Sequence, residues 1–197
     1  MKIYDISQEV FTSKVYPGDP APQKESLSSM ERGDLYNLTA FSMCAHNGTH
    51  IDAPAHFIQS GKTVEQIPLT QMVGYAYVCQ RNGDVTAEDA REILASAAQL
   101  HPDAAKRILI GGNATVTLEA AEVFAGEKIY LIGNESQTVG PENAPMAVHL
   151  KLLGAEVVLL EGIRLTNVPE GVYLLNTAPL LLGSAEGAPC RAILMEV

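Results

Sequence analysis

The spacing of hydrophobic residues changes about halfway along the chain. In the first half, short strands are predicted at residues 2–7, 35–44 and 74–80. Over residues 35–44 apolar and polar residues alternate, as expected for a strand, in which side chains two positions apart lie on the same face. In the first of these strands we expect Ile3 and Ile6 to point inward. Prolines and a glycine in residues 15–20 predict an irregular loop, and residues 63–69 predict a short connection of one helical turn.

In the second half, apolar runs alternate with helical patterns. Strands are expected at residues 107–110, 128–132 and 156–160, and helices at residues 86–98, 117–124 and 145–153. Strands that alternate with helices predict right-handed crossovers and a largely parallel, buried sheet.

Shorter signals complete this picture. Residues 82–84 predict a turn, and Thr86 is expected to cap the helix that follows, with acidic residues in its first turn. Residues 172–176 and 192–197 predict closing strands. No repeat or low-complexity linker divides the sequence, so we expect one mixed α/β domain over residues 1–197.

Composition and charge exclude some classes of function. Apolar residues make up 47% of the 197 residues and charged residues 18%, as in a folded globular protein. A formal charge of −10 argues against a nucleic-acid partner, which would require a basic face. No apolar run reaches the ~18–20 residues of a membrane span, and residues 1–10 lack the apolar run of a signal peptide. We therefore expect no membrane partner and a cytoplasmic location, with Cys44, Cys79 and Cys190 as reduced thiols.

Residues 45–57, AHNGTHIDAPAHF, carry the densest group of candidate metal ligands. Four of them lie within eleven residues: His46, His50, Asp52 and His56. Gly48 and Pro54 argue against a helix, and an extended segment would direct these even-numbered residues to one side. Nitrogen and oxygen donors without thiolate suit a catalytic metal rather than the usual structural zinc site. The alternative is a polar surface loop with incidental histidines. Cys44 could reach the same side, but we expect it to pack nearby rather than to bind metal.

The glycine pair before Asn113 could indicate a nucleotide-binding site. A glycine pair after a strand could cradle a phosphate, but the sequence contains neither GxGxxG nor GxxxxGK[ST]. We expect an ordinary turn there and no nucleotide.

HNGTHIDAPAHF resembles the HxGTHxDxPxH signature of the cyclase family of metal-dependent hydrolases, which includes the bacterial kynurenine formamidases. Every fixed position of that signature is present. The resemblance extends to His149, followed twelve residues later by Glu161, and to the ending with its VPEG turn at residues 168–171. It implies a single mixed-sheet α/β domain of the cyclase type, swivelling β/β/α-like.

The resemblance also implies a ligand set that the residues alone do not establish, since a helix histidine or a strand-end glutamate is usually a surface residue. His46, His50 and Asp52 would hold one divalent ion, and Asp52, His149 and Glu161 a second, with Asp52 bridging. Zinc is the first choice and manganese the alternative. His56 stays free to act as acid and base while a metal-activated water attacks a carbonyl. The implied reaction is hydrolysis of a small amide, N-formylkynurenine to kynurenine and formate, a step of tryptophan catabolism, by a homodimer or larger homo-oligomer.

Two positions depart from the kynurenine formamidase pattern. Tyr16 stands where those enzymes have a tryptophan that contacts substrate, and residues 133–141 read GNESQTVGP where many members have an IDTPS-like stretch. These departures leave other readings open. They include a cyclic amide, as in isatin hydrolases, a hydroxy acid or lactone, and a non-catalytic metal-binding protein.

Overall fold

The computed structural model describes residues 1–196 and has a mixed nine-stranded sheet within that range. The strand order is β1-β13-β11-β5-β7-β9-β10-β4-β12. The central strands β5, β7, β9 and β10 are parallel, and the pairs on both sides of them are antiparallel. The strands are β1 Ile3–Asp5, β4 His50–Asp52, β5 Val73–Gln80, β7 Arg107–Gly111, β9 Leu131–Asn134, β10 Val158–Glu161, β11 Gly171–Asn176, β12 Gly187–Pro189 and β13 Ile193–Met195.

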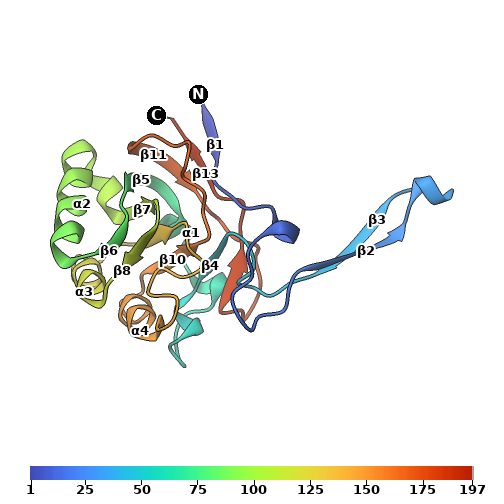
Figure 1. The fold of residues 1–197 in the computed structure, drawn as a ribbon, viewed down its shortest axis with the longest axis horizontal. Coiled ribbons are helices and arrows are strands. Elements are labelled where there is room, and N and C mark those ends of the chain that lie inside the picture. Colours follow the sequence, from blue (N-terminus) through green and yellow to red (C-terminus); the bar gives the residue numbers. More distant parts are fainter. Residues whose placement is uncertain (197) are drawn as a thin grey trace.

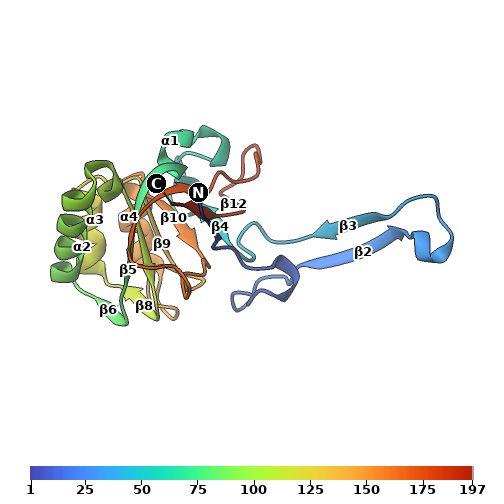
Figure 2. The same cartoon turned by 90° about the horizontal axis from the view of Figure 1, so that it is seen from above.

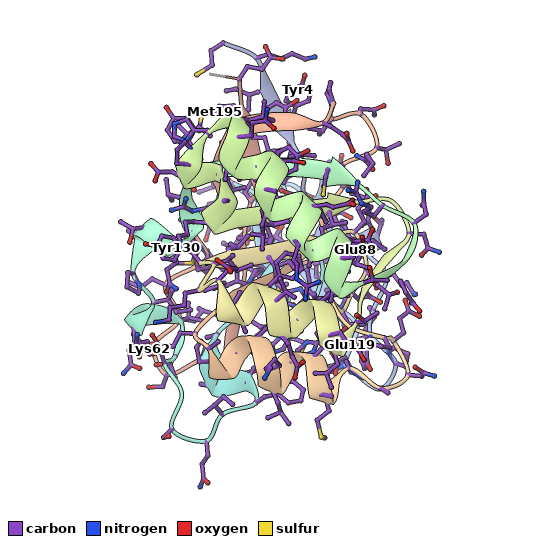
Figure 3. All side chains as sticks on the ribbon, turned by 90° about the vertical axis from the view of Figure 1, so that its left-hand side faces the viewer. Tyr4, Lys62, Glu88, Glu119, Tyr130 and Met195 are labelled. Carbon is purple, nitrogen blue, oxygen red and sulfur yellow. The ribbon has the colours of Figure 1, made fainter. Side chains whose placement is uncertain are left out.

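Three helices cover one face of this sheet (Figure 1). They are α2 Ala87–Leu100, α3 Leu118–Gly126 and α4 Met146–Gly154. Figure 3 shows them side by side, with Glu88 and Glu119, from the first turns of α2 and α3, toward the same edge. This arrangement is the expected result of successive strand–helix–strand crossovers of one hand. The one-turn helix α1 is Leu69–Met72, and 3-10 turns lie at Val10–Thr12, Met30–Arg32, Pro54–His56, Val64–Gln66 and Pro102–Lys106.

The sheet is buried on both faces. Ile108 and Ile110 of β7 belong to the apolar cluster beneath the helices, whereas Leu109 belongs to the cluster on the opposite face. Side chains along a strand alternate between its faces, so a strand covered on both sides must be apolar at every position. This explains the continuous apolar runs in the second half of the sequence.

Two small sheets lie outside the main one. Strands β6 (Gly83–Val85) and β8 (Ala114–Val116) form a parallel pair. Strands β2 (Gln23–Ser28) and β3 (Leu38–Ser42) form an antiparallel hairpin. Figures 1 and 2 show that this hairpin, residues 23–42, projects away from the body of the protein. We call it the arm.

The predicted helices α2, α3 and α4 and the predicted strands β5, β7, β9, β10, β11 and β13 are present in the expected order, and the Thr86 cap is confirmed. The Thr86 hydroxyl accepts from the Asp89 amide, and the Asp89 carboxylate accepts from the Thr86 amide at 2.8 Å. The expected strand in residues 35–44 is β3, at Leu38–Ser42, and the turn in residues 63–69 is the 3-10 turn Val64–Gln66.

Three details of the sequence interpretation are wrong. Ile3 is 54% exposed while Ile6 is fully buried, because residues three apart in an extended segment lie on opposite faces. The turn expected at 82–84 is largely strand, since β6 begins at Gly83. The strand expected from residue 128 begins at Leu131, because Lys128 has a positive φ of 50° that extended backbone does not allow. Strands β2, β6, β8 and β12 were not anticipated.

Candidate metal centre

The pairing of β4 with β10 brings three of the candidate ligands together. His50 lies opposite Glu161, and Asp52 lies opposite Leu159. Residues directly opposite in an antiparallel pair point to the same face, and Leu159 belongs to the cluster beneath the helices. His50, Asp52 and Glu161 therefore point toward the helical face, while Ile51 between them packs into the opposite core.

Helix α4 supplies the fourth group from above. The Nε2 atom of His149 lies 3.2 Å from Oε1 of Glu161 and 3.6 Å from Oδ2 of Asp52. His46, in the turn before β4, directs Nδ1 to Oδ1 of Asp52 at 2.8 Å. Two triads result, each with its ligand atoms within 4.8 Å of one another: His46, His50 and Asp52, and Asp52, His149 and Glu161. The structure thus brings together the five residues to which the sequence pointed.

Asp52 belongs to both triads, and its two carboxylate oxygens face different partners. Oδ1 lies near His46 and near Nε2 of His50, at 3.4 Å, whereas Oδ2 faces His149. The Asp52 side chain is fully buried. Neither Oδ2 nor Nε2 of His50 has a hydrogen-bond partner among residues 1–196. Unpartnered buried polar atoms are costly, and a cation held by each triad would satisfy the unpartnered atom in that triad.

The imidazoles of His46, His50 and His149 each direct one ring nitrogen toward the buried carboxylates. The other ring nitrogen lies within hydrogen-bond distance of an acceptor outside the cluster. Nδ1 of His50 lies 3.1 Å from the Gly48 carbonyl, and Nδ1 of His149 lies 3.0 Å from the Pro145 carbonyl. A carbonyl can only accept, so in each ring Nδ1 donates, which leaves Nε2 facing the cluster. Metal-binding histidines have this arrangement, in which an outer acceptor fixes the tautomer and the ring orientation.

Glu186 is the outer acceptor for His46, a contact that was not predicted from the sequence. Its Oε1 lies 3.2 Å from Nε2 of His46. The next residue, Gly187, leaves room for that ring, because a Cβ there would come within 2.6 Å of Cε1 of His46. Glu186 is 140 residues from His46 and belongs to no motif of the sequence, so no signal could have identified it.

The charges of the metal-free cluster are strongly coupled. Burial lowers the pKa of His50 and of His149, but the nearby carboxylates of Asp52 and Glu161 outweigh it and raise both values to about 10. Burial raises the pKa of Asp52, yet the surrounding imidazoles hold it well below its usual range. Without metal, protonated imidazoles therefore supply the positive charge that these buried carboxylates require.

His56 lies beside the cluster and outside both triads. It ends the 3-10 turn Pro54–His56, and its ring centroid lies 4.2 Å from that of His46 and 6.2 Å from that of His149. Its imidazole forms no hydrogen bond within the described part of the chain. Partial burial lowers its pKa, so the neutral ring, which can accept a proton, predominates at neutral pH.

The chain matches known proteins along its whole length. The family model named Cyclase matches residues 4–141. The chain belongs to the Cyclase family. A kynurenine formamidase of Salinibacter ruber (strain DSM 13855 / M31) is 30% identical, over 100% of this chain and 98% of that protein.

Solved structures agree with this assignment. A structure described as a potential metal-dependent hydrolase with cyclase activity matches with a TM-score of 0.80 at 28% identity, covering 98% of this chain and 96% of that one. Isatin hydrolase A of Labrenzia aggregata shares the fold, with a TM-score of 0.78 at 22% identity, over 98% of this chain and 93% of that chain. The expected fold class of a single mixed α/β domain of the cyclase type is confirmed.

In this Cyclase-family chain, the segments that carry the two departures from the kynurenine formamidase pattern, residues 14–17 and 133–143, contact each other. The Tyr16 hydroxyl donates to the Glu142 carbonyl at 3.1 Å, and Gln137 donates to the Lys14 carbonyl. The two segments enclose a small cavity of about 240 Å³. The second segment is also tied to the cluster, because the Val139 amide donates to Oε1 of Glu161 at 2.8 Å.

Two other features of the sequence lie outside the cluster. The Cys44 thiol is 3.9 Å from Oδ2 of Asp19 and belongs to neither triad. Gly112, with φ of 86°, forms the expected bend, and its amide donates to the Glu135 carboxylate. A carboxylate bound to that amide would repel a phosphate.

Proposed function

We propose that this chain is a metal-dependent hydrolase of a small amide that binds two divalent ions, most specifically an arylformamidase that converts N-formylkynurenine to kynurenine and formate. The substrate proposal is supported by whole-length similarity to a protein named kynurenine formamidase. The observation that carries the binuclear centre is the Asp52 carboxylate, buried between two triads with one oxygen directed to each.

The donors of the two triads suit such ions. His46, His50 and Asp52 would hold one ion, and Asp52, His149 and Glu161 the other. Imidazole nitrogen and carboxylate oxygen without thiolate favour zinc or manganese in a catalytic role. When bound, such ions lower the pKa of a water molecule and polarise a carbonyl oxygen.

His56 is proposed as the acid and base of the reaction. Its ring is adjacent to His46, and its lowered pKa keeps it neutral and able to accept a proton near pH 7. Amide hydrolysis needs one proton removed from the attacking water and one delivered to the departing amine. A single imidazole beside the centre can do both in turn, because it is protonated by the first step and gives up the proton in the second.

The surrounding residues hold this arrangement in place. Glu186 orients His46 through Nε2, and the Val139 amide orients Glu161. The segment around Val139 also contacts the Tyr16 loop through Glu142 and Gln137. We propose that Tyr16 contributes to substrate binding, as part of the two segments that contact each other here. A phenol in place of an indole leaves more room, and a cyclic amide is therefore the alternative substrate class.

We further propose that the protein acts in the cytoplasm. All three cysteines are unpaired in the structure, as expected in a reducing compartment. Within residues 1–196, no helix is both long and apolar enough to span a membrane.

Elemental analysis together with hydrolysis of N-formylkynurenine tests the proposal. About two divalent ions per chain, with turnover that chelation abolishes and added metal restores, would support it. Two ions with turnover of isatin and none of N-formylkynurenine would move the substrate to the cyclic amides. Two ions without turnover of any amide, formyl anilide or lactone would favour a non-catalytic metal-binding protein. A chain that binds no metal even after soaking contradicts the central claim.

A further inference from the structure

The Thr49 side chain joins two strands that carry candidate ligands. Thr49 immediately precedes His50, the first residue of β4. Gly162 immediately follows Glu161, the last residue of β10. The Thr49 hydroxyl donates to the Gly162 carbonyl at 2.8 Å. Because β4 and β10 are antiparallel, this bond joins the strands one residue beyond the opposed pair of His50 and Glu161.

The same hydroxyl also accepts a hydrogen bond from the amino-terminal segment. The Gln8 amide donates to the Thr49 hydroxyl at 2.9 Å, and Nε2 of Gln8 donates to the Gly162 carbonyl at 2.8 Å. The Gly162 carbonyl therefore accepts from two side chains, which use both of its lone pairs. Three residues from distant parts of the chain form a closed ring of hydrogen bonds. We call Gln8, Thr49 and Gly162 the brace.

Gln8 is held in position by contacts that involve no candidate ligand. Ile6, two residues earlier, is fully buried. Its amide donates to the Ala192 carbonyl at 3.0 Å, and its carbonyl accepts from the Arg164 amide at 2.9 Å. The Arg164 guanidinium also donates to Oε1 of Gln8 at 2.5 Å. These bonds fix Gln8 without the help of a bound ion.

The position of Thr49 also determines the position of the acceptor that orients His50. The Gly48 carbonyl, 3.1 Å from Nδ1 of His50, belongs to the planar peptide group that links Gly48 to Thr49. On the other side of Thr49, its own carbonyl accepts from the Cys190 amide at 3.0 Å. Both peptide groups around Thr49 are therefore restrained. A change at the Thr49 hydroxyl should move the His50 ring relative to Glu161.

The geometry favours a positioning role for Thr49 over a direct role in the reaction. Thr49 is 3% exposed, and the single proton of its hydroxyl is donated to the Gly162 carbonyl. No donor remains on this side chain that could stabilise a substrate oxygen. Thr49 can therefore affect the reaction only through the residues that it holds in place.

We propose that Gln8 and Thr49 are positioning residues of the candidate metal centre, which fix the His50 ring relative to Glu161 before an ion binds. The proposal rests on the binuclear ligand set proposed above, in which His50 and Glu161 belong to different triads. Ligands whose positions are locked by hydrogen bonds to their neighbours keep the geometry that a metal requires. Ligands already in place also lose less freedom on binding, so the brace should raise the affinity for metal.

The zinc affinity of Thr49→Val, titrated against a competing chelator, tests the proposal. Valine keeps the shape of threonine but removes both hydrogen bonds of the hydroxyl. The affinity should fall about tenfold to a hundredfold, the usual effect of losing a group that orients a ligand. Thr49→Ser keeps the hydroxyl and should restore most of the affinity. Gln8→Ala removes one of the two donors to the Gly162 carbonyl and should lower the affinity about tenfold.

Thr117→Val is the matched control. The Thr117 hydroxyl also donates to a carbonyl of another segment, that of Val85 at 2.9 Å, and also accepts from an amide, that of Ala120 at 3.2 Å. It caps α3 and contacts no candidate ligand. This variant should lower the free energy of unfolding, because it removes a helix cap, while the zinc affinity stays at the wild-type value.

Hydrogen exchange of the metal-free protein supplies a readout that does not depend on zinc. The β4 amides should exchange faster in Thr49→Val than in the wild type or in Thr49→Ser, because the brace closes one end of the β4–β10 pair. Gln8 is only partly buried, so Gln8→Ala tests the same brace should Thr49→Val fail to fold.

The outcomes separate this proposal from the proposed function. A wild type that binds two ions, with an unchanged affinity in Thr49→Val and Gln8→Ala, would overturn the positioning role alone. An equal loss of affinity in Thr117→Val, or no recovery in Thr49→Ser, would do the same. A wild type that binds no zinc would overturn the proposed function, and the positioning role with it.

Discussion

His50 and Glu161 face each other across the antiparallel pair of β4 and β10, with Nε2 of His50 3.6 Å from Oε2 of Glu161. The two residues are far apart in the sequence. Their opposition in register directs both side chains to the face that α4 covers, where His149 completes the group. The candidate metal centre therefore depends on one strand register, and a slip of one residue would turn both candidate ligands of β4, His50 and Asp52, away from it.

Asp52→Asn should remove most of the metal and lower turnover at least about a hundredfold. The amide keeps the shape of the carboxylate but loses the charge, and it cannot offer one anionic oxygen to each triad. Elemental analysis and steady-state kinetics measure the effect. Asp84→Asn, at an exposed position on β6, is the control and should change neither quantity. Full metal content in the Asp52 variant would argue against a bridging carboxylate.

His56→Ala should abolish turnover while the metal content stays unchanged. His56 lies outside both triads and is assigned the proton transfers, so its removal leaves the ligands in place. Loss of metal in this variant would make His56 a ligand and would require a new assignment of the acid and base.

Glu186→Gln should weaken metal binding by about tenfold to a hundredfold, the usual effect of changing a residue that orients a ligand. The amide can still accept from Nε2 of His46 but no longer carries the negative charge. Titration with zinc against a competing chelator measures the affinity. Unchanged affinity would make the contact between Glu186 and His46 incidental.

The metal-free protein should lose stability as the pH rises from about 6.5 to about 10. His50 and His149 have pKa values of about 10 in the folded chain, above the ~6.5 of an unfolded histidine. Their stabilising charge is fully present below the unfolded value and is lost as the pH passes the folded one. Chemical denaturation of the chelated protein across this range measures the trend, and a flat profile would contradict the charge state assigned to the cluster.

Sequence predicted the centre better than its surroundings. The spacing placed four even-numbered residues on one side of an extended segment: His46, His50, Asp52 and His56. This holds for His50 and Asp52, which share a face of β4, whereas His46 lies in the turn before that strand and His56 in the 3-10 turn after it.

The proposed ligand roles of His149 and Glu161 were implied only by the resemblance. They depend on the pairing of β4 with β10 and on the position of α4 above these strands, which the spacing of residues does not reveal. Glu186 could not be predicted, because it approaches His46 through a tertiary contact between distant segments.

In the fold, too, some elements were predictable from the sequence and others were not. Residues 107–111 are apolar at nearly every position because both faces of β7 are covered, and this pattern was readable. Strand β2 reads QKESLS and has little apolar character, since within residues 1–196 it pairs only with β3 in the projecting arm. A strand that does not pack against a core has no need of regularly spaced apolar residues, so the sequence contains no pattern that would predict it.

The five proposed ligands are spread from residue 46 to residue 161, and this spread limits when metal can bind during folding. No stretch synthesised early contains a complete second triad, and α4 must be packed on the sheet before His149 meets Asp52. Binding of the second ion, on the proposed ligand set, would therefore be a late event that follows assembly of the sheet. On the proposed ligand set, the metal content of a preparation counts its correctly folded molecules, and truncated or misregistered chains would be visible as a deficit in metal per chain.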